Sequence, residues 1–172
     1  MASRIKILPD SLASKIAAGE VVQRPESVVK ELLENAVDAN AASIELIVKQ
    51  AGKSLIQVCD DGSGMTEEEA LLCIHKHATS KISSMEDLES IKTLGFRGEA
   101  LSSIASVCQL EIRTETRDSE IGTLLKIESE NEITTEKIST SKGTCVAVKN
   151  IFYNIPERRK FLKTNNTELK HI

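Results

Sequence analysis

The chain has 172 residues, of which 40% are hydrophobic and 28% charged, as is usual for one globular domain with its own core. Aromatic residues make up only 2% and the net charge is −4, which argues against a base-stacking surface and against a dedicated nucleic-acid module. No apolar run is long enough to span a membrane and the first ten residues lack a secretory core, so we expect a protein that is not secreted and has no membrane partner.

Two helices are predicted first. Asp10 suits the cap of a short helix through Ala18, with Gly19 closing it, and Pro25 suits the first turn of a longer helix to about Ala39. The apolar face of the longer helix has six members at helical spacing: Val28, Val29, Leu32, Leu33, Ala36 and Val37.

A hairpin is expected next. Asn40 tolerates the left-handed conformation that ends helices, and the alternation at 44–48 predicts a half-buried strand. The segment 51–53 turns the chain into a second strand at about 55–59. The segment 60–64 is a turn, and Thr66 with Glu69 forms a capping box for a helix ending near residue 77.

The second half mixes helices and strands. Ser84 can cap a short helix through residue 91, and a glycine-bearing loop, 94–99, leads into a helix at about 99–106. Three strand-like segments follow at 109–116, 123–128 and 144–149, and Pro156 opens a last helix running towards residue 172. This order predicts the α+β class: a mixed, mostly antiparallel sheet with helices on one face.

The cysteines and neighbouring histidines offer two simple hypotheses. The four cysteines are widely spaced without a C-x-x-C pair, which favours reduced core thiols in a cytosolic protein: Cys59, Cys73, Cys108 and Cys145. Cys73 lies close to His75 and His77. On a helix only Cys73 and His77 share a face, and no further ligand cluster is visible, so we do not expect zinc.

Four elements carry chemistry. The first is a polar stripe on the long helix, opposite its apolar face, made of Glu31, Glu34, Asn35 and Asp38. Such a stripe is most often a solvated helix face. Its functional interpretation is that glutamate accepts a proton from an attacking water, while asparagine offers Mg²⁺ a neutral oxygen.

The other three elements are glycine-bearing turns. The run DDGSG at 60–64 follows a hydrophobic strand, so Asp60 at the strand end can accept a hydrogen bond from an amine such as that of adenine, and Gly64 lets the backbone approach a flat ring. The run GFRGE at 95–99 precedes a helix, as in a phosphate-binding loop. Thr144 follows Gly143 at a strand start, where its hydroxyl can bond a base or a water.

A Walker A loop is excluded. The run GKS at 52–54 resembles its end, but the motif requires a glycine where Ile47 stands, and the glycine and lysine fit a hairpin turn better.

These elements, in this order, resemble the Bergerat (GHKL) ATP-binding fold of type II topoisomerases, sensor histidine kinases, one class of heat-shock chaperones and MutL proteins. Longer motifs resemble the MutL-type DNA mismatch-repair family in particular. They are KIAAGEVV at 15–22, SVVKEL at 27–32, HATSKI at 77–82, GFRGEAL at 95–101, FYNIP at 152–156 and KFL at 160–162. The motifs at 15–22 and 77–82 are of the MutL type and do not fit a topoisomerase or kinase subunit.

The resemblance implies roles for individual residues. Glu31 is similar to the general base, Asn35 to the Mg²⁺ ligand and Asp60 to the adenine-reading carboxylate. The remaining ATP contacts implied are Gly64, the lid residues Thr79, Ser80 and Lys81, the phosphate-loop residues Gly95, Phe96, Arg97 and Gly98, and Thr144. Three positions depart from the family pattern: Asp61 replaces asparagine, Asn40 replaces glycine, and Cys145 replaces a second threonine.

The resemblance also implies function and organisation. It implies slow, Mg-dependent ATP hydrolysis that drives N-terminal dimerisation, with a homodimer or heterodimer partner and a mismatch recognition protein as partners. Residues 1–172 would be the N-terminal ATPase domain, ending before its last strands and before a transducer domain that supplies a γ-phosphate lysine and most of the DNA contacts. The chain alone would then be a weak or inactive ATPase, in the bacterial cytoplasm or a eukaryotic nucleus.

Two alternatives stay open. The chain can instead be a non-catalytic nucleotide-binding module that recruits partners. The basic run at 158–160 with Lys163 is either a solvated helix face or a contact to DNA phosphates.

Overall fold

The structure, a computed structural model, describes residues 6–79, 93–95, 98–129 and 131–172. The helix expected at 84–91 lies outside these residues. The helical elements are α1 (Asp10–Val21), α2 (Pro25–Asp38), the 3₁₀ turn η1 (Gln50–Gly52), α3 (Glu67–Leu72), α5 (Ala100–Val107), α6 (Pro156–Phe161) and α7 (Asn165–His171). The strands are β1 (Ile44–Lys49), β2 (Leu55–Asp60), β3 (Gln109–Glu115), β4 (Gly122–Ser129), β5 (Glu132–Ile138) and β6 (Gly143–Lys149).

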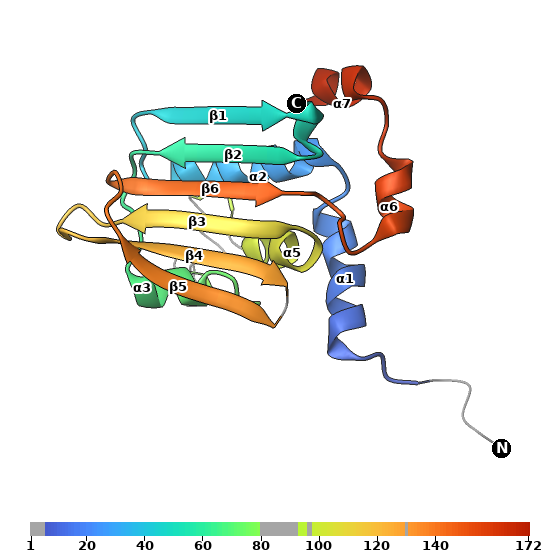
Figure 1. Ribbon diagram of the computed structural model, residues 1–172, viewed down its shortest axis with the longest axis horizontal. Helices are drawn as coiled ribbons and strands as arrows, with labels where there is room; N and C mark the ends of the chain where they lie inside the picture. The colour runs from blue at the N-terminus through green and yellow to red at the C-terminus, as the bar shows by residue number, and fades with distance from the viewer. Residues whose placement is uncertain (1–5, 80–92, 96–97, 130) are drawn as a thin grey trace.

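The strands form one six-stranded sheet in the order β1-β2-β6-β3-β4-β5, and each neighbouring pair is antiparallel. Strand β6, the last in sequence, lies between β2 and β3 and so joins the two halves of the chain. Helices α2 and α5 cover one face of the sheet (Figure 1). The expected α+β class, with helices on one face, is confirmed.

The core lies between the sheet and these helices. Ile56 and Val58 on β2, Ile112 on β3 and Leu125 on β4 point to this face, and each is at most 2% exposed. The buried residues of α2 are Pro25, Val28, Val29, Leu32 and Ala36. Val37, expected on the same apolar face, is 52% exposed instead. Helix α2 is thus fixed by its apolar stripe, and its polar stripe is left to face a cleft.

Three helix boundaries differ from those expected. Pro9, and not Asp10, occupies the N-cap of α1, and the helix continues through Gly19 to Val21. A Cβ at Gly19 would meet the guanidinium of Arg158, so Arg158 packs over this glycine, and the glycine does not end the helix. Helix α3 does have the expected capping box of Thr66 with Glu69, but it ends at Leu72.

The expected last helix is two helices. It breaks at Leu162, and the Thr164 side chain accepts a hydrogen bond from the amide of Thr167 to begin α7. Helix α7 is anchored by Glu168, which is 1% exposed, accepts from the amide of Lys163 at 2.7 Å and lies 3.8 Å from Arg24 Nε.

Strand β5 was not expected from the sequence. Its burial pattern contains no buried residue, so it lacks the alternation that marks a half-buried strand. It is the edge of the sheet, paired with β4 on one side.

The expectation of four reduced thiols is wrong for two of them. Cys59 on β2 and Cys145 on β6 are directly opposite in the register and form a disulfide. Spacing along the sequence does not reveal this, because 86 residues separate the pair. Cys73 and Cys108 are free thiols, as expected.

Within the described ranges, none of the helices has the length and apolar character needed to cross a membrane.

Candidate functional site

A cleft of about 1760 Å³ lies between α2, the ends of β2 and β6, and the loop that leads into α5. It is larger than the roughly 300–1,000 Å³ of most small-molecule pockets. The structure brings eight of the expected site residues to its walls: Glu31, Asn35, Asp60, Gly64, Thr79, Gly95, Gly98 and Thr144. Four others, Ser80, Lys81, Phe96 and Arg97, lie outside the described residues.

One end of the cleft is built on the sheet. Asp60 is the last residue of β2 and lies opposite Thr144, near the start of β6. Its Oδ1 accepts a hydrogen bond from the amide of Gly62 at 2.9 Å. Burial raises the pKa of Asp60, backbone N–H groups of Gly62 and Thr144 oppose that rise, and the nearby charge of Asp61 adds to it. A half-buried carboxylate at this end is suited to accept a hydrogen bond from an amine.

Thr114 on β3 organises this end and was not expected from the sequence. It is 1% exposed, and its hydroxyl oxygen lies 3.0 Å from that of Thr144. The same hydroxyl donates to the carbonyl of Gly143 at 3.1 Å and accepts from the amide of Met65 at 2.8 Å. Thr114 therefore ties β6 and the turn after β2 together. A lone threonine in a strand carries no signal of such a role.

Any residue larger than glycine at position 64 would force the backbone to move. Gly64 has a φ of +68°, and a Cβ there would lie 2.1 Å from the carbonyl oxygen of Glu115. The turn at 60–64 therefore packs directly on the end of β3.

Asp61, which stands where the resemblance implies asparagine, has a structural role. Its Oδ1 accepts from the amides of Ala42 at 2.7 Å and Ser43 at 2.9 Å, just before β1 begins. These two hydrogen bonds hold the pKa of Asp61 below its usual value. Its charge is thus satisfied by backbone amides outside the cleft wall.

The polar stripe of α2 forms a second wall. Glu31 and Asn35 are half-buried and line the cleft one helical turn apart, so a carboxylate and a carboxamide face the same space. Glu34 lies 3.5 Å from Lys30, four residues earlier on the same helix, which gives it a local partner.

The other end of the cleft is held by Asp38, whose role the sequence did not disclose. Its Oδ1 accepts from the amide of Leu94 at 2.9 Å and its Oδ2 from the amide of Gly95 at 3.1 Å. One carboxylate thus fixes the start of the glycine loop against α2. The available signal was its place on the stripe, three residues after Asn35.

The far side of this loop contacts the segment that begins the expected lid. Gly98 has a φ of +63°, and a Cβ there would lie 2.7 Å from the carbonyl oxygen of Ala78. Next to this contact, His77 Nδ1 lies 3.4 Å from Glu99 Oε1. The two segments are therefore packed backbone to backbone.

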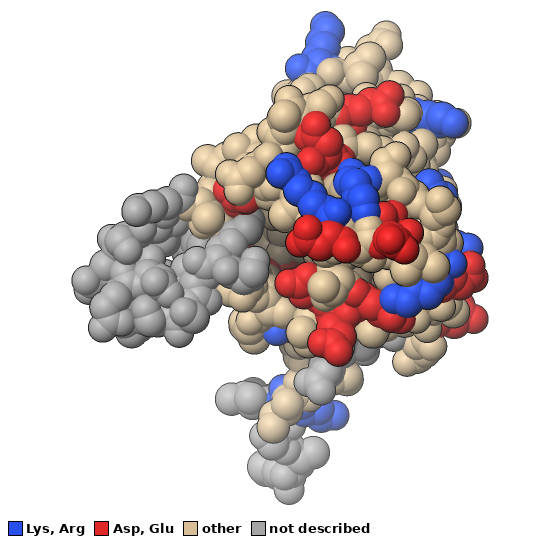
Figure 2. Space-filling model, turned by 90° about the vertical axis from the view of Figure 1, so that its left-hand side faces the viewer, with Lys and Arg blue, Asp and Glu red and all other residues tan. Residues whose placement is uncertain are grey.

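The end of the sheet that carries the β3–β4 and β5–β6 connections has intermixed charges on its surface (Figure 2). Lys142 lies 2.6 Å from Glu115, and Lys137 lies 2.6 Å from Glu67. Figure 2 shows acidic groups as prominent as basic ones on this face, unlike a surface built for phosphate backbones.

The three residues of the basic run at 158–160 lie in different environments. Arg158 donates to the carbonyl of Val22 at 3.3 Å and stacks 5.4 Å from the centre of the Phe152 ring, so it holds α6 against the end of α1. Arg159 and Lys160 are exposed. Arg158 is thus a packing residue.

Residues 23–151, which include most of these cleft residues, match the family model of the histidine kinase-, DNA gyrase B- and HSP90-like ATPases. The chain belongs to this ATPase family. Within the family it is 54% identical to the DNA mismatch repair protein MutL of Christiangramia forsetii over 172 residues, which is all of this chain and 28% of that protein. It is 59% identical to MutL of Chloroherpeton thalassium over 170 residues, 99% of this chain and 27% of that protein.

Solved structures of the family agree. The Aquifex aeolicus MutL ATPase domain complexed with ADP superposes with a TM-score of 0.66 at 35% identity, over 88% of this chain and 52% of that chain. The N-terminal domain of a DNA repair protein superposes with a TM-score of 0.74 at 33% identity, over 91% and 45%. The resemblance to the MutL-type ATPase region is therefore confirmed along the chain, which spans about 28% of the length of the first relative.

Proposed function

We propose that this chain binds ATP with Mg²⁺ and hydrolyses it slowly, and that the nucleotide drives dimerisation of a MutL-type mismatch-repair protein. The observation that carries the proposal is the single cleft in which the α2 stripe, the end of β2 and the glycine loop meet. Further support comes from the similarity to an ATPase domain that was solved with ADP.

At the sheet end, the Asp60 carboxylate accepts a hydrogen bond from the exocyclic amine of adenine, and Thr144 supplies a hydroxyl beside it. The backbone of Gly64 lets the flat base approach closely. At the other end, the loop from Gly95 to Gly98 precedes α5, so its amides and the helix N-terminus favour the phosphates.

Hydrolysis is assigned to the α2 stripe. Glu31 accepts the proton of the attacking water, because it is the carboxylate one turn before Asn35 on the cleft wall. The donors fit magnesium, which takes one or two protein oxygens together with substrate phosphates, and Asn35 would hold it. Bound there, the ion would neutralise charge on the triphosphate. Thr79, Ser80 and Lys81 would contribute to the lid, and Phe96 and Arg97 to the phosphate loop.

Dimerisation is assigned to the N-terminal arm, roughly residues 1–22. Leu12 and Ile16 lie one turn apart on α1 and are 45% and 54% exposed, and Leu8, 48% exposed, just precedes the helix, so the three form an exposed apolar stripe. Such a stripe is suited to bury itself on a second copy or a related subunit. In this proposal residues 1–172 act as the N-terminal ATPase domain, and the DNA contacts and the mismatch recognition protein engage mainly other parts of the whole protein.

A phosphate-release assay on the full-length protein tests the proposal. Wild-type protein should release phosphate slowly from ATP with Mg²⁺, and Glu31→Ala should lower turnover by roughly 10²–10⁴-fold because the general base is lost. ATP-analogue binding should persist in Glu31→Ala. Unchanged turnover in this variant would remove Glu31 from its role. Binding without any phosphate release by the wild type would favour a non-catalytic nucleotide-binding module.

A further inference from the structure

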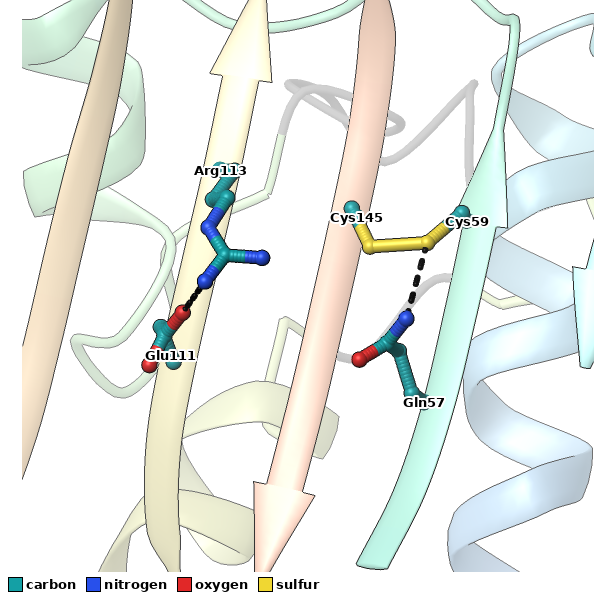
Figure 3. The surroundings of a disulfide bond; sticks show 5 residues. All are labelled: Gln57, Cys59, Glu111, Arg113 and Cys145. Atoms are coloured by element: carbon teal, nitrogen blue, oxygen red, sulfur yellow. Dashed lines mark hydrogen bonds and ion pairs between the residues drawn. A yellow bond between two sulfur atoms is a disulfide. The ribbon is translucent and has the colours of Figure 1, made fainter. Parts of the chain in front are cut away.

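The Cys59–Cys145 disulfide lies on the sheet face away from the helices (Figure 3). Val58 and Val146, the neighbours of the two cysteines, are buried against the helices, so the cysteines point the other way. Both cysteines are only half-buried. The pair therefore lies outside the core between the sheet and the helices.

The surroundings of the pair are polar. Arg113 on β3 is directly opposite Cys145 in the register and lies on the same face as the disulfide (Figure 3). Its guanidinium is paired there with the Glu111 carboxylate (Figure 3). Gln57 Nε2 also donates to Cys59 Sγ at 3.5 Å. The free cysteines differ, because burial raises the pKa of Cys73 and that of Cys108 to about 12.

The pair is also joined directly to the cleft. Cys59 immediately precedes Asp60, Cys145 immediately follows Thr144, and Asp60 and Thr144 are themselves opposite each other. The disulfide therefore links β2 to β6 one residue away from this pair. The backbone N–H of Thr144 opposes the rise in the pKa of Asp60, so it faces this carboxylate. The link thus holds β6 close to the acceptor that a base amine would use.

We propose that Cys59 and Cys145 are a reversible thiol–disulfide modification site, and that forming the disulfide weakens nucleotide binding at the adjacent cleft. The oxidant class is a low-molecular-weight disulfide. One cysteine thiolate attacks it, forms a mixed disulfide and releases one thiolate. The second cysteine thiolate then attacks the protein sulfur of the mixed disulfide and releases the other thiolate. The protein loses two protons and two electrons, and the small disulfide is reduced to two thiols.

The effect on binding rests on the proposed function, whereas the modification itself does not. In the reduced form no covalent bond joins β2 to β6 beside Asp60 and Thr144, so the Asp60 carboxylate can adjust to a base amine. Any dithiol reductant that restores the two thiols restores this state.

The test uses full-length protein incubated either with excess oxidised glutathione or with dithiothreitol. Non-reducing proteolysis and mass spectrometry should find the Cys59 and Cys145 peptides joined in the first sample and separate in the second. Binding of a fluorescent ATP analogue with Mg²⁺ should be about three- to tenfold weaker in the oxidised sample, and dithiothreitol should reverse the loss. Cys59→Ser/Cys145→Ser should show no response to the oxidant, and Cys108→Ala, which keeps the pair, should respond like the wild type.

Absence of the joined peptide would overturn the modification site. A joined peptide with unchanged affinity, or an equal loss in the double variant, would overturn its coupling to the cleft. Failure of the reduced wild type to bind the analogue would instead contradict the proposed function, while the peptide map would still decide whether the pair is modified.

Discussion

The two ends of the cleft are built differently. At the sheet end, Asp60, Thr144 and Thr114 come from the adjacent strands β2, β6 and β3, so the strand register itself brings them together. At the loop end, the two hydrogen bonds from Leu94 and Gly95 to Asp38 fix the loop to α2. Under the proposed function, base recognition is preorganised by the sheet, whereas phosphate binding depends on a few side-chain to backbone contacts.

The largest expected effect is at the sheet end. Asp60→Asn should weaken ATP binding about 10- to 100-fold, because a charge-assisted hydrogen bond to the base is worth roughly 1.5–3 kcal/mol. Adenosine binding should fall equally, since the base is the shared part. Calorimetric titration measures both. Asp61→Asn is the matched control and should bind normally, because its remaining Oδ1 can still accept from Ala42 and Ser43. Similar losses in both variants would contradict the assignment.

Thr114→Val tests whether the sheet end is preorganised. The isosteric change removes a buried hydroxyl that serves Met65, Gly143 and Thr144, so the free energy of unfolding should fall by about 1–3 kcal/mol. Denaturant unfolding measures this, and Thr114→Ser, which keeps the hydroxyl, should lose less. If the valine and serine variants were equally stable, the hydroxyl network would not hold this end together.

Asp38→Asn tests the loop end. The amide keeps one acceptor, so one of the two loop hydrogen bonds is lost and the loop is less well positioned. ATP should bind about three- to tenfold more weakly, while adenosine binding stays the same. Glu34→Gln, on the same stripe with Lys30 as its partner, is the control. Equal losses for ATP and adenosine would break the distinction between the two ends.

The smallest expected effect is the pH dependence that Asp60 gives to stability. Burial raises its folded pKa above the ordinary 3.8, so its contribution to stability is fully present below that value and is lost as pH rises through the folded pKa. Wild-type protein should therefore lose stability relative to Asp60→Asn as pH rises from below 3.8 into the neutral range. Urea unfolding of the two proteins at several pH values measures this difference. If the wild type instead gained stability relative to Asp60→Asn over that range, the folded pKa of Asp60 would be lowered and the account of its burial would be wrong.

Sequence patterns predicted the elements that carry strong local signals. Pro25 and the apolar residues of α2 marked that helix, and Thr66 with Glu69 marked the start of α3. Strand β5 escaped because an edge strand without a buried residue has no hydrophobic alternation to detect. Gly19 misled because a glycine near the end of a helical pattern is a usual stop signal, whereas α1 continues through it to Val21.

The site divides in the same way. Asp60 and the α2 stripe could be predicted, because each sits in a local motif beside a strand or on a helix face. Three features could not be predicted: the hydrogen bonds of the Thr114 hydroxyl, the loop contacts of Asp38 and the pairing of Cys59 with Cys145. All three depend on strand register or on loop placement, which join residues far apart in the chain.

The most direct test is calorimetric titration of ATP with Mg²⁺ into folded, full-length protein in reducing buffer. The proposal predicts saturable uptake of one nucleotide per chain, greatly weakened by Asp60→Asn. A folded wild-type protein that takes up no adenosine nucleotide would contradict it.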